Sequence, residues 1–162
     1  MGEIIDGDLY RKVLGRYPTG VTIVTATGEE GPIGMVIGSF VSVSLEPPLV
    51  GFLPAKVSQT WPLIEATGMF CVNVLADDQQ GLVDSFVRKD DDPWASVPFQ
   101  LAASGSPIME GAVAVIDCSI DRVVDAGDHW FVTGEVAGVE YSEEGSPLVF
   151  LGGAYGRFES RS

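Results

Sequence analysis

The sequence is poor in the side chains that most enzymes use for metal binding and covalent catalysis. It holds two cysteines and one histidine in 162 residues. Sites built from several histidines or from clustered cysteines are therefore excluded, and we expect no metal. Cys71 and Cys118 each lie in an apolar, β-like run, which predicts two buried free thiols.

Basic residues are also scarce, since 9 Lys and Arg oppose 23 Asp and Glu and leave a net charge of -14. Such a chain repels nucleic acid and anionic membrane surfaces, so we expect neither as a partner. The apolar runs end well before the roughly 20 residues that a membrane span requires. The N-terminal stretch lacks the basic start and apolar core of a secretory signal. We therefore expect a cytoplasmic protein with a single domain over residues 1–162.

Three common catalytic motifs are missing as well. The sequence has no G-x-x-x-x-G-K-[ST] loop, no G-x-S-x-G nucleophile elbow and no glycine-rich dinucleotide fingerprint. The sequence therefore offers few side chains for covalent catalysis. A cofactor that brings its own chemistry is the remaining route to an enzyme.

The chain is rich in segments with the residue pattern of β-strands. Two β-rich runs over 20–44 flank a turn at 28–32, and further runs lie at 47–53, 69–76, 111–142 and 147–158. The run over 111–142 divides into two long strands around 125–128. Because strands do not alternate regularly with helices, the pattern predicts a mainly β protein, a closed antiparallel barrel with a few short helices.

The expected helices are few and short. One follows Asp6 as N-cap and ends before Pro18, a second lies within 57–68, and a third lies within 77–87 with Asp77 or Asp78 as its cap. Residues 88–107 are polar and contain proline, which predicts a long loop that Trp94 could anchor.

The segment GMVIGSFVSVSLEPPLV, residues 34–50, carries Ser39, Ser42 and Ser44 in an apolar setting. A buried hydroxyl costs stability unless it forms a hydrogen bond. The neighbouring backbone is one possible partner. The other is a flat heteroaromatic ligand, such as an isoalloxazine ring, that pairs with the free edge of a strand. The spacing leaves both interpretations open.

The segment LPAKVSQTWPLI is a second candidate, here for an anion. Lys56 supplies charge, and Ser58 and Thr60 supply hydroxyls just before a helix that begins near Pro62. The plainer interpretation makes Ser58 or Thr60 an N-cap and Lys56 an ordinary surface lysine.

Six segments, in order and spacing, resemble the short-chain flavin reductases that supply reduced flavin to two-component monooxygenases. They are YPTGVTIVTA, GMVIGSFVSVSLEPPLV, KVSQTWPLI, FCVNVLA, GDHWFVTGEV and PLVFLGGAY, and the resemblance runs from about Tyr10 to Tyr155. It implies an FMN-binding split β-barrel of antiparallel, Greek-key type, usually a homodimer. It also implies an NAD(P)H:flavin oxidoreductase that passes hydride from NADH or NADPH to FMN, or to FAD, with a transient partner oxygenase.

The resemblance also implies roles for individual residues. The isoalloxazine-binding strand matches Met35, Val36, Ile37, Gly38, Ser39 and Phe40, with Ser42 and Ser44 at its far end; the phosphate-binding turn matches Lys56, Ser58 and Thr60; His129 matches a histidine near the nicotinamide, and Tyr155 a closing aromatic. Without the resemblance, His129 is a hairpin residue with a solvated ring.

The chain departs from its relatives at two of these positions. They commonly carry Thr at the position of Val36 and Asn or Ser at that of Gly38, so the backbone must supply more of the flavin contacts here. Two alternatives stay open. One is a split-barrel flavoenzyme with tightly held flavin that acts on an organic substrate, and the other is a non-catalytic flavin-binding protein.

Overall fold

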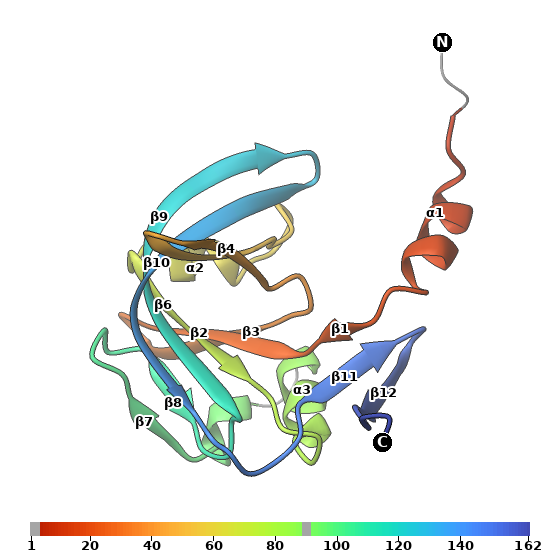
Figure 1. Ribbon diagram of the computed structural model, residues 1–162. Helices are drawn as coiled ribbons and strands as arrows, with labels where there is room; N and C mark the ends of the chain where they lie inside the picture. The colour runs from red at the N-terminus through yellow and green to blue at the C-terminus, as the bar shows by residue number, and fades with distance from the viewer. Residues whose placement is uncertain (1–3, 89–91) are drawn as a thin grey trace.

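The computed structural model describes residues 4–88 and 92–162, and its main feature is a seven-stranded antiparallel sheet. The sheet curls into a barrel (Figure 1) with the strand order β3-β2-β6-β9-β10-β5-β4. Its strands are β2 (Thr22–Gly28), β3 (Gly31–Ile37), β4 (Val41–Leu45), β5 (Pro48–Phe52), β6 (Met69–Val74), β9 (Ala114–Ala126) and β10 (His129–Tyr141). The prediction of a mainly β protein with few short helices is confirmed.

The barrel is split, and not closed by a continuous ladder as the strand pattern alone suggested. β3 and β4 are the two edges of the sheet, although residues 38–40 join them directly. The single run predicted after the turn, over 33–44, is therefore two strands. Ser39 lies in the break, where its hydroxyl accepts a hydrogen bond from the Leu53 amide at 3.0 Å and donates to the Leu53 carbonyl at 3.4 Å. This contact extends the β4–β5 pairing, in which Val41 faces Gly51, by two residues into the break.

The barrel core is apolar and closely packed. The side chains of Val24, Phe52 and Phe70 are fully buried, and the rings of Phe52 and Phe70 meet edge to face at 5.1 Å. Cys71 and Cys118 are buried and free, as predicted. Burial raises the pKa of both thiols to about 12, so they stay protonated at neutral pH.

In the described part of the chain, three α-helices and one 3-10 helix accompany the sheet: α1 (Gly7–Leu14), α2 (Trp61–Glu65), α3 (Gln80–Val87) and η1 (Pro93–Ala95). Asp6 caps α1 as predicted, accepting a hydrogen bond from the Asp8 amide at 2.7 Å. The predicted cap of α3 is wrong. Its N-cap is Gln79, because the Asp77 amide donates to the Ser146 carbonyl at 2.8 Å and holds that residue outside the helix. No helix of the described ranges is long and apolar enough to cross a membrane.

Part of the loop predicted over 88–107 is a hairpin, formed by β7 (Phe99–Leu101) and β8 (Pro107–Met109). Trp94 does anchor this segment, because its ring packs edge to face on Phe86 of α3 at 5.1 Å and on Phe99 at 5.3 Å. Residues 89–91 of the predicted loop lie outside the described residues.

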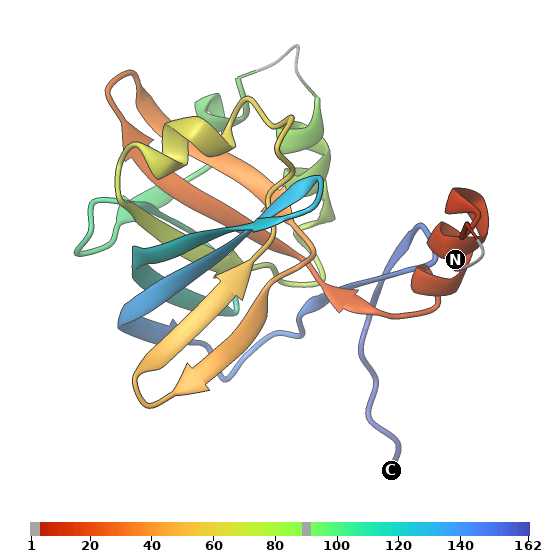
Figure 2. The same cartoon turned by 90° about the horizontal axis from the view of Figure 1, so that it is seen from above.

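A second, smaller sheet has the order β1-β11-β12, with β1 (Thr19–Gly20), β11 (Leu148–Leu151) and β12 (Ala154–Arg157). The stretch 147–158, predicted as one strand, is thus a hairpin. It turns at Gly152 and Gly153, whose φ angles of 60° and 86° favour glycine. Figures 1 and 2 show this sheet and the N-terminal arm, residues 4–18 with α1, standing out from the barrel. None of the α1 side chains is buried.

Candidate functional site

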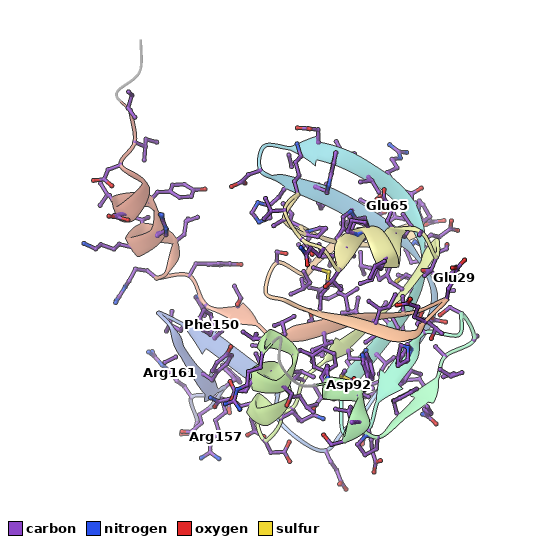
Figure 3. The ribbon with its side chains drawn as sticks, turned by 180° about the vertical axis from the view of Figure 1, so that it is seen from behind. Glu29, Glu65, Asp92, Phe150, Arg157 and Arg161 are labelled. Carbon is purple, nitrogen blue, oxygen red and sulfur yellow. The ribbon has the colours of Figure 1, made fainter. Side chains whose placement is uncertain are left out.

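A cleft of about 1470 Å³ lies beside the first half of β3, and we call it the first cleft. Its walls are the β2–β3 turn, the segment 57–60 with one face of α2, the end of α3, and η1. Figure 3 views the molecule from this side, with Glu29 in the turn, Glu65 on α2 and Asp92 just before η1. Of the predicted site residues, Ser58 and Thr60 line it.

β3 presents its backbone, more than its side chains, to the site. Ile37 belongs to the main core, Met35 packs against that core, and Val36 packs against a second core cluster that includes Val83 of α3. Within the described residues β3 pairs only with β2, so the amide and carbonyl groups of its other edge have no ladder partner. The predicted isoalloxazine strand is therefore an edge strand, which the hypothesis of ring pairing requires.

Gly34 explains how the wall opposite α2 is built. A Cβ atom at this position would lie 2.6 Å from Cε1 of Phe86 and 3.1 Å from Cζ2 of Trp94. Only glycine therefore lets this aromatic pair close over β3. The pair in turn places the end of α3 at the first cleft.

The two hydroxyls of the turn at 58–60 differ in their hydrogen bonds. The Ser58 hydroxyl oxygen accepts hydrogen bonds from the amides of Thr60 at 3.2 Å and Trp61 at 3.1 Å, so Ser58 caps α2. Because it accepts in both bonds, its own O–H remains a donor. The Thr60 side chain makes no capping bond. Both hydroxyls are thus able to donate to an anion in the first cleft.

Lys56, unlike Ser58 and Thr60, is not among the residues that line the first cleft. Its ammonium pairs with the Asp125 carboxylate at 2.5 Å and lies 4.6 Å from the centroid of the Trp130 ring. Its role as a phosphate ligand stays a prediction. Arg88, at the end of α3, does line the first cleft. Sequence reasoning missed it, because Arg88 opens a polar stretch that was assigned to a loop; its place after an amphipathic helix was the available signal.

His129 lies at the tip of the β9–β10 hairpin, which we define as residues 125–130. Its Nδ1 is 2.7 Å from a carboxylate oxygen of Asp128, and this hydrogen bond holds the pKa of Asp128 below its usual range. The ring is partly exposed. A β-bridge between Ala55 and His129 brings the hairpin tip beside the segment that leads to Ser58. Two predicted parts of the site, distant in sequence, are thus neighbours in space.

The remaining predicted residues lie around the far end of β3. Gly38 lines a second cleft, of about 890 Å³, together with Arg11, Lys12 and Arg16 of the arm. The Tyr155 ring packs on Phe150, which lines the same cleft, at 5.1 Å. This arrangement separates Gly38 and Tyr155 from the first cleft.

The side chains that follow Gly38 do not gather in one place. Phe40 packs against the main core, while Ser42 is exposed and Ser44 half-buried on the edge strand β4. The described residues hold no group of three or more His, Cys, Asp or Glu side chains that could bind a metal ion.

The geometry fits a flavin: an unpaired strand edge for the ring system, and two hydroxyls with a guanidinium for the phosphate. Comparison with known proteins gives the same answer. A family model described as the flavin reductase like domain matches residues 14–159. A flavin reductase of Pseudomonas putida is 50% identical over 155 residues, which cover 95% of this chain and 91% of that protein.

Two solved structures are similar over nearly the whole chain. The nitrilotriacetate monooxygenase component B homologue of Mycobacterium thermoresistibile has a TM-score of 0.92 and 43% identity, covering 98% of this chain and 89% of the other. An NADH:FAD oxidoreductase of Streptomyces globisporus, solved with NAD and FAD fragments, has a TM-score of 0.89 and 36% identity, covering 98% of both chains. The family match spans both the barrel and the candidate site, and the chain therefore belongs to the flavin reductase like domain family.

Proposed function

We propose that this protein is an NAD(P)H:flavin oxidoreductase that passes hydride from a nicotinamide to FMN or FAD and supplies the reduced flavin to a partner monooxygenase. One observation carries the proposal. The unpaired edge of β3 runs beside a cleft whose other walls offer Ser58, Thr60 and Arg88. The similar proteins described above include an NADH:FAD oxidoreductase and a monooxygenase component, and they support the same reaction.

The phosphate of the flavin would be held in the first cleft. Arg88 supplies a guanidinium, which pairs with phosphate oxygens through charge-assisted hydrogen bonds. Thr60 and Ser58 supply neutral donors, and the capping bonds of Ser58 fix its position. Glu29 and Glu30 also line this cleft, so the cation has to outweigh nearby carboxylates.

The ring system would lie along Met35, Val36, Ile37 and Gly38, bound by main-chain groups. Ser39 completes this strand segment, but its hydroxyl is already bonded to Leu53. Tyr155, which shares a core cluster with Val36, would border the ring near the far end of β3. Phe40 packs in the main core, and Ser42 and Ser44 lie on β4, so contacts from these three residues stay predictions from the family resemblance.

A bound flavin supplies the hydride acceptor, so the chain needs no side-chain nucleophile. The protein contributes placement, because holding the two rings at near-attack distance can lower the barrier by several kcal/mol. His129 would contact the nicotinamide. Because Asp128 engages its Nδ1, the other ring nitrogen is left for a ligand.

We further propose that the protein is a homodimer. The arm exposes Ile5, Leu9 and Val13 to 71%, 58% and 59%. A helix of 8 residues such as α1 is not stable alone in water, where isolated helices need about 12–15 residues to form. A second copy would cover this apolar stripe. The buried free thiols are consistent with a reducing compartment, so we also propose a cytoplasmic location.

Anaerobic stopped-flow mixing of the protein with FMN or FAD and with NADH or NADPH tests the reaction. We expect rapid loss of the flavin absorbance with at least one pair, against a slow control without protein. We also expect flavin to be lost on gel filtration, as suits a diffusing substrate. Flavin that stays bound through gel filtration would indicate a flavoenzyme acting on another substrate. Binding without reduction would indicate a non-catalytic protein.

A further inference from the structure

Lys56 lies where the segment that carries Ser58 meets the hairpin tip. The Lys56 amide donates to the Asp128 carbonyl at 2.9 Å, and the Trp130 amide donates to the Pro54 carbonyl at 2.9 Å. These two bonds flank the β-bridge between Ala55 and His129. The main chain on both sides of His129 is therefore tied to the segment 54–56.

The Lys56 side chain adds a contact to each strand of the hairpin. Asp125 of β9 and Trp130 of β10 are directly paired across the ladder. The ammonium bonds to the carboxylate of Asp125 and lies over the ring of Trp130. One cation thus holds both strands at the tip, with 30% of its side chain exposed. The hydrogen bond from Lys56 lowers the pKa of Asp125.

We propose that Lys56 is a positioning residue: its ammonium holds the hairpin tip, and with it His129, against the segment 54–58, and it does not bind the flavin phosphate. The proposal rests on the proposed function, because His129 has a role only if a nicotinamide binds beside it. It also links the two halves of the site. Ser58 follows Lys56 by two residues, so one short segment carries both the phosphate donors and the hairpin contact.

The competing role, a phosphate ligand, requires the ammonium to leave Asp125 and Trp130. A lysine ammonium is a compact point charge, and reaching the first cleft would cost it an ion pair and a cation–π contact together. Arg88 already lines that cleft. The two roles therefore predict opposite kinetic effects.

Lys56→Met removes the charge and keeps most of the aliphatic stem. We expect the KM for the nicotinamide to rise about two- to fivefold, no more than in His129→Ala, with kcat and the Kd for FMN each changed by less than about twofold. Lys56→Arg keeps the cation and should restore the KM. A loss of FMN affinity of tenfold or more, with an unchanged KM, would overturn the proposal in favour of the phosphate role.

Asp125→Asn is a second variant with sharper discrimination. It frees the ammonium without removing it. If Lys56 positions the hairpin, this variant behaves like Lys56→Met. If Lys56 binds phosphate, the freed ammonium binds FMN more tightly, and that result would contradict the proposal.

Arg122→Met is the matched control, because Arg122 is an exposed cation on β9 that pairs only loosely with Asp121, at 3.7 Å. It should leave the KM unchanged. Lys56→Met in a His129→Ala background supplies a double-mutant cycle. Because Lys56 acts through His129, the KM should not rise further in that background. Independent, additive effects of the two changes would refute positioning.

Amide hydrogen exchange gives a readout that needs no activity. The backbone amides of position 56 and of Trp130 should exchange faster in Lys56→Met and Asp125→Asn than in the wild type and in Arg122→Met. Unchanged exchange in both variants would overturn the proposal. If the wild type reduces no flavin with either nicotinamide, the proposed function fails, and this exchange experiment still decides whether Lys56 holds the hairpin.

Discussion

The barrel and the N-terminal arm use apolar residues in opposite ways. In the barrel, Val24, Phe52 and Phe70 are fully buried, whereas Leu9 and Val13 in the arm are more than half exposed. Both regions carry their apolar residues at the period of their secondary structure. The difference shows that periodicity identifies an apolar face without showing what covers it. The barrel covers its own face, and the arm needs a surface from elsewhere.

A matched pair of leucine truncations gives the largest contrast between these regions. Leu75 is fully buried and Leu9 is 58% exposed. Leu75→Ala should lower the free energy of unfolding by about 2–5 kcal/mol, because it removes buried contacts and leaves a cavity. Leu9→Ala, measured by urea unfolding at low protein concentration, should change it by less than about 0.5 kcal/mol. Equal losses would show that the arm packs on its own barrel.

Charged residues on the apolar face of α1 test what covers the arm. Leu9→Glu with Val13→Glu should weaken the proposed dimer by about 2–4 kcal/mol, since each apolar side chain of this size contributes about 1.5–3 kcal/mol when fully buried. Light scattering at micromolar concentration should then report a mass near 17.2 kDa. Lys12→Glu makes the same change of net charge at another position on α1 and should leave the dimer intact. A wild-type protein that is already monomeric would remove the claim.

Variants in the first cleft test whether the flavin binds to the barrel and not to the N-terminal arm. Thr60→Ala with Arg88→Ala should weaken FMN binding by about 2–3 kcal/mol, because one charge-assisted and one neutral hydrogen bond are lost. The mass and the unfolding free energy should not change. FMN affinity is measured by fluorescence titration. Lys56→Ala is the comparison variant, in which the affinity for FMN should stay nearly unchanged. Wild-type affinity in the double variant would place the phosphate elsewhere.

The smallest expected effect is at His129. His129→Ala should raise the KM for the nicotinamide a few-fold, about 1 kcal/mol or less, while FMN affinity stays within error. The ring is partly exposed and makes its contact with Asp128 at the hairpin tip, away from the phosphate donors. Steady-state kinetics with varied NADH gives the KM. If neither constant changes, His129 is a solvated hairpin residue.

Most strands could be predicted because their signals are local. The hairpin from β2 to β3 turns at Glu29 and Glu30 between paired glycines, and the β9–β10 hairpin turns at Gly127 and Asp128. The β7–β8 hairpin was missed because its support is tertiary. The Pro107 carbonyl accepts hydrogen bonds from the side chains of Thr25 at 2.6 Å and Asn73 at 3.3 Å, on two other strands. No local pattern contains that information.

The residues of the candidate site also fall into those that local sequence predicts and those that tertiary contacts place. The hydroxyls of Ser58 and Thr60 could be proposed from their place before a helix, and the structure brings both to the first cleft. The pairing of Lys56 with Asp125 could not, because it joins residues far apart in sequence. Arg88 reaches the cleft only because Gly34 lets α3 pack closely on β3. Such tertiary contacts decide which cation faces the cleft.

The unpaired edge of β3 also bears on solubility. An exposed strand edge is a template for strands of other molecules, and proteins commonly protect such edges with charge or proline. β3 has no charged residue, and its one proline is Pro32, near its start. Two factors then oppose intermolecular sheet growth: the net charge of -14, and any ligand bound along the edge. Aggregation of the flavin-free protein should accordingly be fastest at high salt, where charge repulsion is screened, and added flavin should slow it.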